Sequence, residues 1–254
     1  MSLTSRSRAG FTFVELSIVI AVIGLIVGGL MLGKSLITQA DVQSVIYSYS
    51  KYTRAVADFR RQYGGLPGDI LDATNYWGDD STTCSDTGVT DGSPGTCNGN
   101  ANENMSESDE PYRAWQQLVM AGYISGQYSG KAIGGGAVPG ANVPKEKVSG
   151  TGWSFGYKAA TSSDSSDYDQ DIGNYLAFGA QTASITNGAA LSGSDAWQID
   201  KKIDDGLPAT GRVITRKPSV LTNCATSATD ASATYNVKET YGKMCSLYLS
   251  LTLK

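Results

Sequence analysis

Two patterns of apolar residues follow one another at the start of this chain, and the first is continuous. From Leu16 to Gly33 there are eighteen residues without a charged side chain. As an α-helix this run would be about 27 Å long, or about 35 Å counted from Phe11. Since the hydrocarbon core of a bilayer is roughly 30 Å thick, the run predicts a membrane-spanning helix.

The second pattern is periodic. Apolar and aromatic residues recur every three or four positions, and charged residues fall mostly elsewhere around the helix. This spacing predicts an amphipathic helix with one buried stripe, ended by Gly64, Gly65 and Pro67. One helix of about 78 Å from Phe11 to Gln62 is therefore expected, with lipid or sister helices around its first half and a sheet beside its second. The stripe consists of Val42, Val45, Tyr49, Tyr52, Val56, Phe59 and Tyr63.

The rest of the chain mixes short helix and strand patterns, which indicates an α+β domain. Helices are expected at 111–121 and 194–205, and strands at 153–157, 174–180 and 211–215. The clearest strand is C-terminal, where Cys245, Leu247, Leu249, Leu251 and Leu253 alternate with polar residues and Tyr248. Its apolar face is expected to lie against the stripe of the long helix, in an antiparallel sheet.

Glu15 is the one carboxylate in the first forty residues. A charged side chain within a membrane-spanning helix costs roughly 2.5 to 3.5 kcal/mol and usually has a partner. Cleavage between Gly10 and Phe11 would create an α-ammonium group one helical turn from Glu15, and either that amine or a neighbouring molecule's amine would neutralise it. Because an amine in the same turn has poor geometry for the pair, the neighbour's amine would make the pair an assembly device.

The segment Gly10–Leu16 (GFTFVEL) resembles the class III signal of type IV pilins and type II secretion pseudopilins, and the similarity extends from Arg8 to about Gly33. The resemblance implies that a prepilin peptidase cuts after Gly10 and N-methylates Phe11, and that Glu15 guides subunits into a helical filament. It implies a pilin-like fold, with a long N-terminal helix packed on an antiparallel sheet. The implied partners are the peptidase, other pilin or pseudopilin subunits and an inner-membrane assembly platform.

One position departs from the family pattern. Gly24 falls where many pilins have a glycine at which the helix loosens inside the filament, but Leu32 falls where many have a kinking proline. Any melting of this helix would depend on Gly24, Gly28 and Gly29, so the filament subtype stays open. Within the family, a pilus subunit is the first choice, a secretion pseudopilin the second and a DNA-uptake pilin the third.

The expected organisation is a leader at 1–10, a transmembrane and assembly helix at 11–33, its amphipathic continuation at 34–63 and an extracytoplasmic α+β domain at 64–254. The leader carries two arginines and no acid, which favours the cytoplasmic side of a bacterial inner membrane. The precursor would be single-pass, and the assembled subunit would lie in a periplasmic or cell-surface filament.

Two other interpretations of the N-terminus account for part of this pattern. A secretory signal peptide cut after Ala40 should have an apolar region of 7 to 15 residues, and this one is longer and preceded by a glutamate. An unprocessed membrane anchor would make Glu15 only a favourable acid near a helix N-terminus. That anchored protein would be a binding module that uses the acidic loop at 79–110 as its contact surface.

Four cysteines in an exported chain indicate two disulfides, and sequence allows three pairings. Cys84 with Cys97 and Cys224 with Cys245 are favoured, because each pair closes one short loop and such loops gain roughly 3 kcal/mol. A zinc site is disfavoured, since the chain has no C-x-x-C motif and no histidine.

Acidic and amide side chains in two regions match the oxygen ligands that calcium prefers. The long polar insert at 66–109 is better explained as a solvated acidic loop, since its spacing matches no EF-hand. Asp204 and Asp205 precede a Gly-Leu-Pro turn, and the resemblance implies calcium there because major pseudopilins bind it in a loop near the C-terminus. Turn chemistry explains these two aspartates equally well.

Composition narrows the function classes. The chain has 20 basic and 24 acidic side chains and an estimated pI of 4.9, so nothing indicates a basic surface for nucleic acid. Without histidine there is no Ser-His-Asp or Cys-His arrangement, and G-x-S-x-G and Walker motifs are absent from the sequence. A structural subunit is expected rather than an enzyme.

Overall fold

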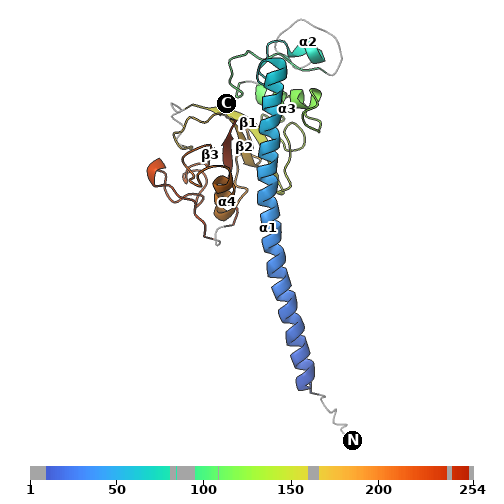
Figure 1. The fold of residues 1–254 in the computed structure, drawn as a ribbon, viewed down its shortest axis with the longest axis vertical. Helices are drawn as coiled ribbons and strands as arrows, with labels where there is room; N and C mark the ends of the chain where they lie inside the picture. The colour runs from blue at the N-terminus through green and yellow to red at the C-terminus, as the bar shows by residue number, and fades with distance from the viewer. Residues whose placement is uncertain are drawn as a thin grey trace, which may run out of the picture. The chain divides into compact units, whose positions relative to one another are not determined.

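The computed structural model describes residues 10–80, 84, 95–107, 109–159, 166–238 and 242–251. The chain divides into two compact units at the boundary between Ala40 and Asp41. Helix α1 (Phe13–Tyr63) continues through this boundary, and Figure 1 traces it from dark blue to cyan. The single long helix agrees with the sequence prediction to within two residues at each end.

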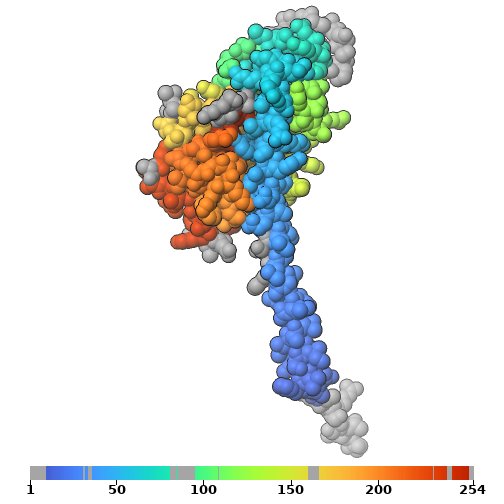
Figure 2. Space-filling view, viewed as in Figure 1, coloured from blue at the N-terminus to red at the C-terminus, as the bar shows by residue number. Residues whose placement is uncertain are grey.

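The second half of α1 packs through the predicted stripe. Six of its seven residues, from Val42 to Phe59, are buried, and Tyr63 is half-buried. The Tyr52 ring forms T-shaped contacts with the rings of Trp115 and Trp153, with centroid distances of 4.9 and 5.7 Å. Tyr49 donates a hydrogen bond of 2.6 Å from its hydroxyl to the Ser250 carbonyl. In Figure 2, atoms of the C-terminal part of the chain lie directly against this light-blue part of α1.

Four antiparallel strands form the sheet, in the order β1-β2-β4-β3. They are β1 (Thr151–Lys158), β2 (Gly173–Ala180), β3 (Val213–Ile214) and β4 (Leu247–Ser250). Leu176 of β2 pairs with Leu249 of β4, which in turn pairs with Val213 of β3. Strand β4, the last described strand, is therefore an inner strand of the sheet and pairs with β2 on one side and β3 on the other.

The prediction of one apolar face for the C-terminal strand was incomplete, because both faces of β4 are buried. Leu247 and Leu249 join the core that includes the α1 stripe. Tyr248 points the other way, into a second cluster with Ile172, Tyr175, Ala177 and Ile214. The Tyr175 and Tyr248 rings lie 4.6 Å apart. Alternation alone did not reveal that an aromatic ring covers the opposite face; Leu253 lies outside the described residues.

The described residues also form the helices α2 (Ala73–Trp77), α3 (Glu110–Met120) and α4 (Gly193–Ile203), of which α3 contacts β1 and α4 contacts β3. Helices α3 and α4 were predicted, α3 by Pro111 in its first turn and Gly122 after its end. The N-cap of α4 is Ser192, whose hydroxyl accepts the Asp195 backbone N–H at 3.1 Å. Helix α2 was not predicted, since its five residues lie in the polar insert. Trp115 anchors α3 to the sheet, with its ring 4.2 Å from Phe155. A short 3₁₀ turn, η1 (Asp230–Ser232), completes the elements.

The inner position of β4 makes a stability prediction. Leu249→Ala removes a fully buried side chain from the centre of the sheet and should lower the free energy of unfolding by about 2–5 kcal/mol, because it leaves a cavity. Chemical denaturation of the full chain in detergent measures this change. Leu71→Ala is the matched control, since Leu71 is 63% exposed and a surface substitution should stay within about 0.5 kcal/mol. Equal effects of both substitutions would contradict the packing described here.

Candidate functional site

The segment before α1 is exposed. Gly10, Phe11 and Thr12 precede the first helical residue, and Phe11 is 91% exposed. A side chain built on Gly10 would meet no atom within 4 Å. Among the residues that the structure describes, none sterically requires glycine at position 10.

Thr12 and Glu15 form a reciprocal cap at the start of α1. The Thr12 backbone N–H and hydroxyl donate to Glu15 Oε2 at 2.8 and 2.9 Å, and the Glu15 N–H donates to Thr12 Oγ1 at 3.2 Å. This is a capping box, in which an N-cap threonine and a glutamate three residues later satisfy each other's backbone donors. The acid also lies at the positive end of the helix dipole.

The capping box adds to the interpretation of Glu15, for which the sequence analysis considered only an amine as partner, either the one freed at Phe11 of the same chain or a neighbouring molecule's. The structure gives it a partner in Thr12, whose backbone N–H and hydroxyl both donate to Glu15 Oε2. The signal that would have found it is the spacing Thr-x-x-Glu at 12–15 immediately before an apolar run. The role of Glu15 in assembly stays a prediction.

The helix that follows is apolar and uncovered. The stretch Phe13–Leu30 is long and apolar enough to cross a membrane, lies near the N-terminus, and none of its residues is buried. The helix is continuous through Gly24, Gly28 and Gly29, and a side chain built on any of them would meet nothing within 4 Å. These glycines leave open space along the helix, and the expected loosening inside a filament stays a prediction.

Both favoured cysteine pairs are bonded in the structure. Cys84 and Cys97 have their Cα atoms 5.5 Å apart, and Cys224 and Cys245 have theirs 5.0 Å apart. The second pair is fully buried and ties Cys224 to Cys245, which lies two residues before β4. The residues between Cys84 and Gly95 lie outside the described part of the chain.

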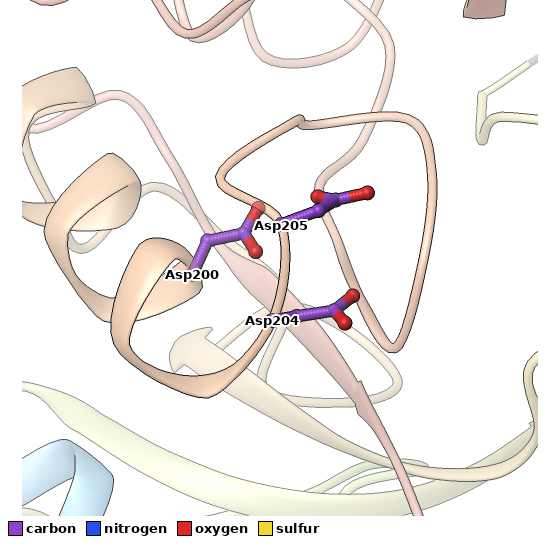
Figure 3. A group of neighbouring side chains, drawn as sticks. All are labelled: Asp200, Asp204 and Asp205. Carbon is purple, nitrogen blue, oxygen red and sulfur yellow. The ribbon is translucent and has the colours of Figure 1, made fainter.

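Asp204 and Asp205, the predicted metal ligands, lie beside a third carboxylate. Asp200, Asp204 and Asp205 each place one oxygen within 4.8 Å of the others. Figure 3 shows Asp200 on the last turn of α4 and the other two on the loop that follows. The sequence places Asp200 in the same carboxylate cluster, but sequence analysis did not single it out as a ligand, because its approach to Asp204 and Asp205 depends on the non-helical conformation of Asp204 after the end of α4.

Each of the three carboxylates accepts hydrogen bonds from N–H or O–H groups of the protein. Asp200 accepts the Gly206 N–H at 3.1 Å and the Tyr235 hydroxyl at 2.9 Å. Asp204 accepts the Arg212 backbone N–H, while Asp205 accepts the Leu207 N–H at 2.8 Å and the Thr210 hydroxyl at 2.7 Å. These bonds shape the loop without an ion. Calcium at Asp204 and Asp205 therefore stays a prediction.

Asp200 predicts a pH dependence of stability. Burial raises the pKa of Asp200 to about 7. The hydrogen bonds from Tyr235 and Gly206 lower this pKa, and the neighbouring carboxylates of Asp205 and Asp204 raise it further. Because the folded-state pKa lies above the unfolded value, Asp200 contributes stability at low pH that is lost as the pH rises through about 7, by at most about 1.4 kcal/mol per pH unit. Asp200→Asn should reduce the loss of stability between pH 5.5 and 7.5, measured by urea unfolding. An unchanged pH profile in this variant would contradict the assignment.

The comparisons with known proteins bear on the N-terminus. Residues 5–31 match the sequence model of the prokaryotic N-terminal methylation motif. Neither the curated proteins nor the solved structures gave a match to this chain. The motif points to a structural, pilin-type protein, and together with the apolar helix it is typical of a membrane-anchored precursor. The chain thus carries, at residues 5–31, the prepilin-type signal that is the signature of type IV pilins and pseudopilins.

Proposed function

We propose that this protein is a structural subunit of a type IV pilus or a related filament, cut between Gly10 and Phe11 by a prepilin peptidase and assembled through α1. The observation that carries the proposal is the match of residues 5–31 to the methylation motif, at the start of a helix with a wholly exposed apolar surface. The pilin-like α+β arrangement of the rest of the chain supports it.

The exposed helix needs two successive environments. Apolar side chains around the whole circumference of Phe13–Leu30 are unfavourable in water, so lipid surrounds them in the precursor and sister helices surround them in the filament. The second half of α1 already has a partner within its own chain, because its stripe is buried in the core. One helix thus serves as anchor, assembly element and core element.

Glu15 would direct the assembly. Cleavage frees the amine of Phe11, and the positively charged amine of a neighbouring subunit would pair with the negatively charged Glu15 carboxylate. The bonds from Thr12 hold Glu15 at the first turn of α1, so the carboxylate is oriented before a neighbour arrives. In a low-dielectric helix bundle, an attraction between opposite charges is weakly screened.

The outer domain would form the surface of the filament. In pilins the segment between the long helix and the sheet is a variable lateral face, and here that segment is the insert at 66–109, closed by the Cys84–Cys97 bond. The proposal includes an inner-membrane assembly platform as partner. A type II secretion pseudopilin uses the same processing and assembly steps, and an image of the assembled filament distinguishes the two roles.

Processing tests the first step. Intact mass and N-terminal sequencing of the membrane-extracted protein, with and without its prepilin peptidase, should show a mature chain that begins at methylated Phe11 only when the peptidase is present. Gly10→Ala should still be partly cut, whereas Gly10→Val should accumulate as precursor, because position 10 is open in this chain and only the peptidase restricts its size. A chain that keeps its leader in both strains would make the protein an unprocessed anchor.

Assembly tests the role of Glu15. Glu15→Ala should insert into the membrane and be processed normally but give few or no filaments, as counted by electron microscopy and by shearing from cells. Thr12→Val is the control, since it removes the capping hydroxyl and keeps the carboxylate; it should weaken the helix start by about 1 kcal/mol and still assemble. If the two variants assemble equally poorly, Glu15 acts as a helix cap. Normal filaments from Glu15→Ala would refute the mechanism.

A further inference from the structure

A groove lies along the exposed flank of the second half of α1. It has a volume of about 290 Å³. The Tyr123 hydroxyl, from the segment after α3, donates to the Asp58 carbonyl at 3.3 Å, so this wall of the groove is attached to the helix. Figure 2 shows the light-blue part of α1 uncovered on the face in view. The lining includes Tyr47, Lys51, Arg54, Ala55 and Asp58 of α1 and Tyr123.

Two cations in this groove have no acidic partner among the described residues. Lys51 and Arg54 are exposed, and neither takes part in an ion pair within the described chain. The Lys51 ammonium lies 5.6 Å from the centroid of the Tyr52 ring. Asp58 is the carboxylate of the lining, and it already pairs with Arg61. The groove therefore presents positive charge to whatever enters it.

Tyr47 gives the groove an apolar side as well. Its side chain is 71% exposed, although it lies on a helix whose opposite face is buried in the core. Tyrosine and arginine are enriched in protein interfaces, where they often contribute most of the binding energy. A concave surface with a tyrosine and two cations therefore suits a segment of protein that carries carboxylates.

Two other polyanions fit the groove poorly. Lys51 is 21 residues beyond Leu30, the end of the apolar stretch, which is about 31 Å along a continuous helix. Attraction to anionic lipids falls off within a Debye length of about 8 Å. A nucleic acid would be repelled by the rest of the chain, since residues 64–254 carry 21 acidic and 13 basic side chains.

We propose that this groove on α1 binds an acidic segment of a second copy of the chain. The inference rests on the proposed filament function, in which copies of α1 are brought together. The surplus of acidic side chains at 64–254 supplies the complementary charge. Exposed carboxylates without an ion pair to a described residue include Glu107 and Asp205.

Such a contact would be directional. Each copy would offer its groove to one neighbour and its acidic surface to another, so that the two sides of the interface differ. Interfaces of this kind generate open helical filaments when the rotation between copies does not close a ring. The groove would thus act together with the Glu15 contact, at the opposite end of the same helix.

Charge reversal tests the groove. Lys51→Glu with Arg54→Glu should be processed normally and keep the wild-type Tm, because both side chains are exposed. It should give at least about tenfold fewer filaments, since like charges would then face each other across the contact. Lys131→Glu with Lys202→Glu is the matched control: it makes the same change in net charge at exposed lysines outside the groove and should assemble as the wild type does.

Cross-linking identifies the partner. A carbodiimide joins a lysine amine to a carboxylate that touches it, and filaments assembled from unlabelled and isotope-labelled chains separate links between copies from links within one copy. The expected product joins Lys51 of one copy to an acidic residue at 64–254 of another. Lys51→Arg keeps the charge, so it should form filaments but lose this link.

The outcomes separate this inference from the proposed function. Normal filament numbers from the groove variant would overturn the inference and leave the filament function standing, as would wild-type filaments in which Lys51 links to no other copy. A groove variant that assembles normally but loses binding to double-stranded DNA would assign the groove to nucleic acid. A wild type that keeps its leader and forms no filaments would overturn both.

Discussion

The burial of one stripe of α1 is the interaction on which the compact unit from Asp41 onward depends. Residues spaced three and four apart on this helix reach the sheet, α3 and the C-terminal strand at once, through Tyr52 with Trp115 and Trp153 and through Tyr49 with Ser250. Without that stripe, the four-stranded sheet would expose its larger apolar face. The second half of the helix is therefore a core element of the domain, whereas Phe13–Leu30 is long and apolar enough to cross a membrane.

The same helix explains why its two halves differ in sequence. A segment surrounded by lipid or sister helices can be apolar on every side, whereas a segment that lies on a sheet needs only one apolar face. The change occurs near Lys34, and the boundary between the two compact units falls close by, after Ala40. Because α1 continues through this region, it is the covalent link between the two compact units.

Much of this arrangement could be predicted from the sequence, and the failures share a cause. The long helix, α3, α4 and strands β1, β2 and β4 have periodic or alternating apolar residues, which report local burial directly. What was missed depends on contacts between distant segments: the covered second face of β4, where Tyr248 meets Tyr175, and helix α2, which lies in a polar stretch. The site residues show the same division. Gly10, Phe11 and Glu15 belong to one short motif, whereas the burial of Asp200 and its approach to Asp204 and Asp205 arise only when the chain folds.

The capping box at the start of α1 has a consequence for the timing of maturation. Thr12 and Glu15 both lie on the mature side of the proposed cut, and the peptide bond that supplies the Thr12 N–H joins it to Phe11, which the cut retains. Removal of the leader would therefore change the charge at the end of the helix without altering the hydrogen bonds that begin it. The helix would enter the filament with the same first turn that it had in the precursor. Proteolysis would then add a positive charge at the N-terminus without changing the fold of the first turn of α1.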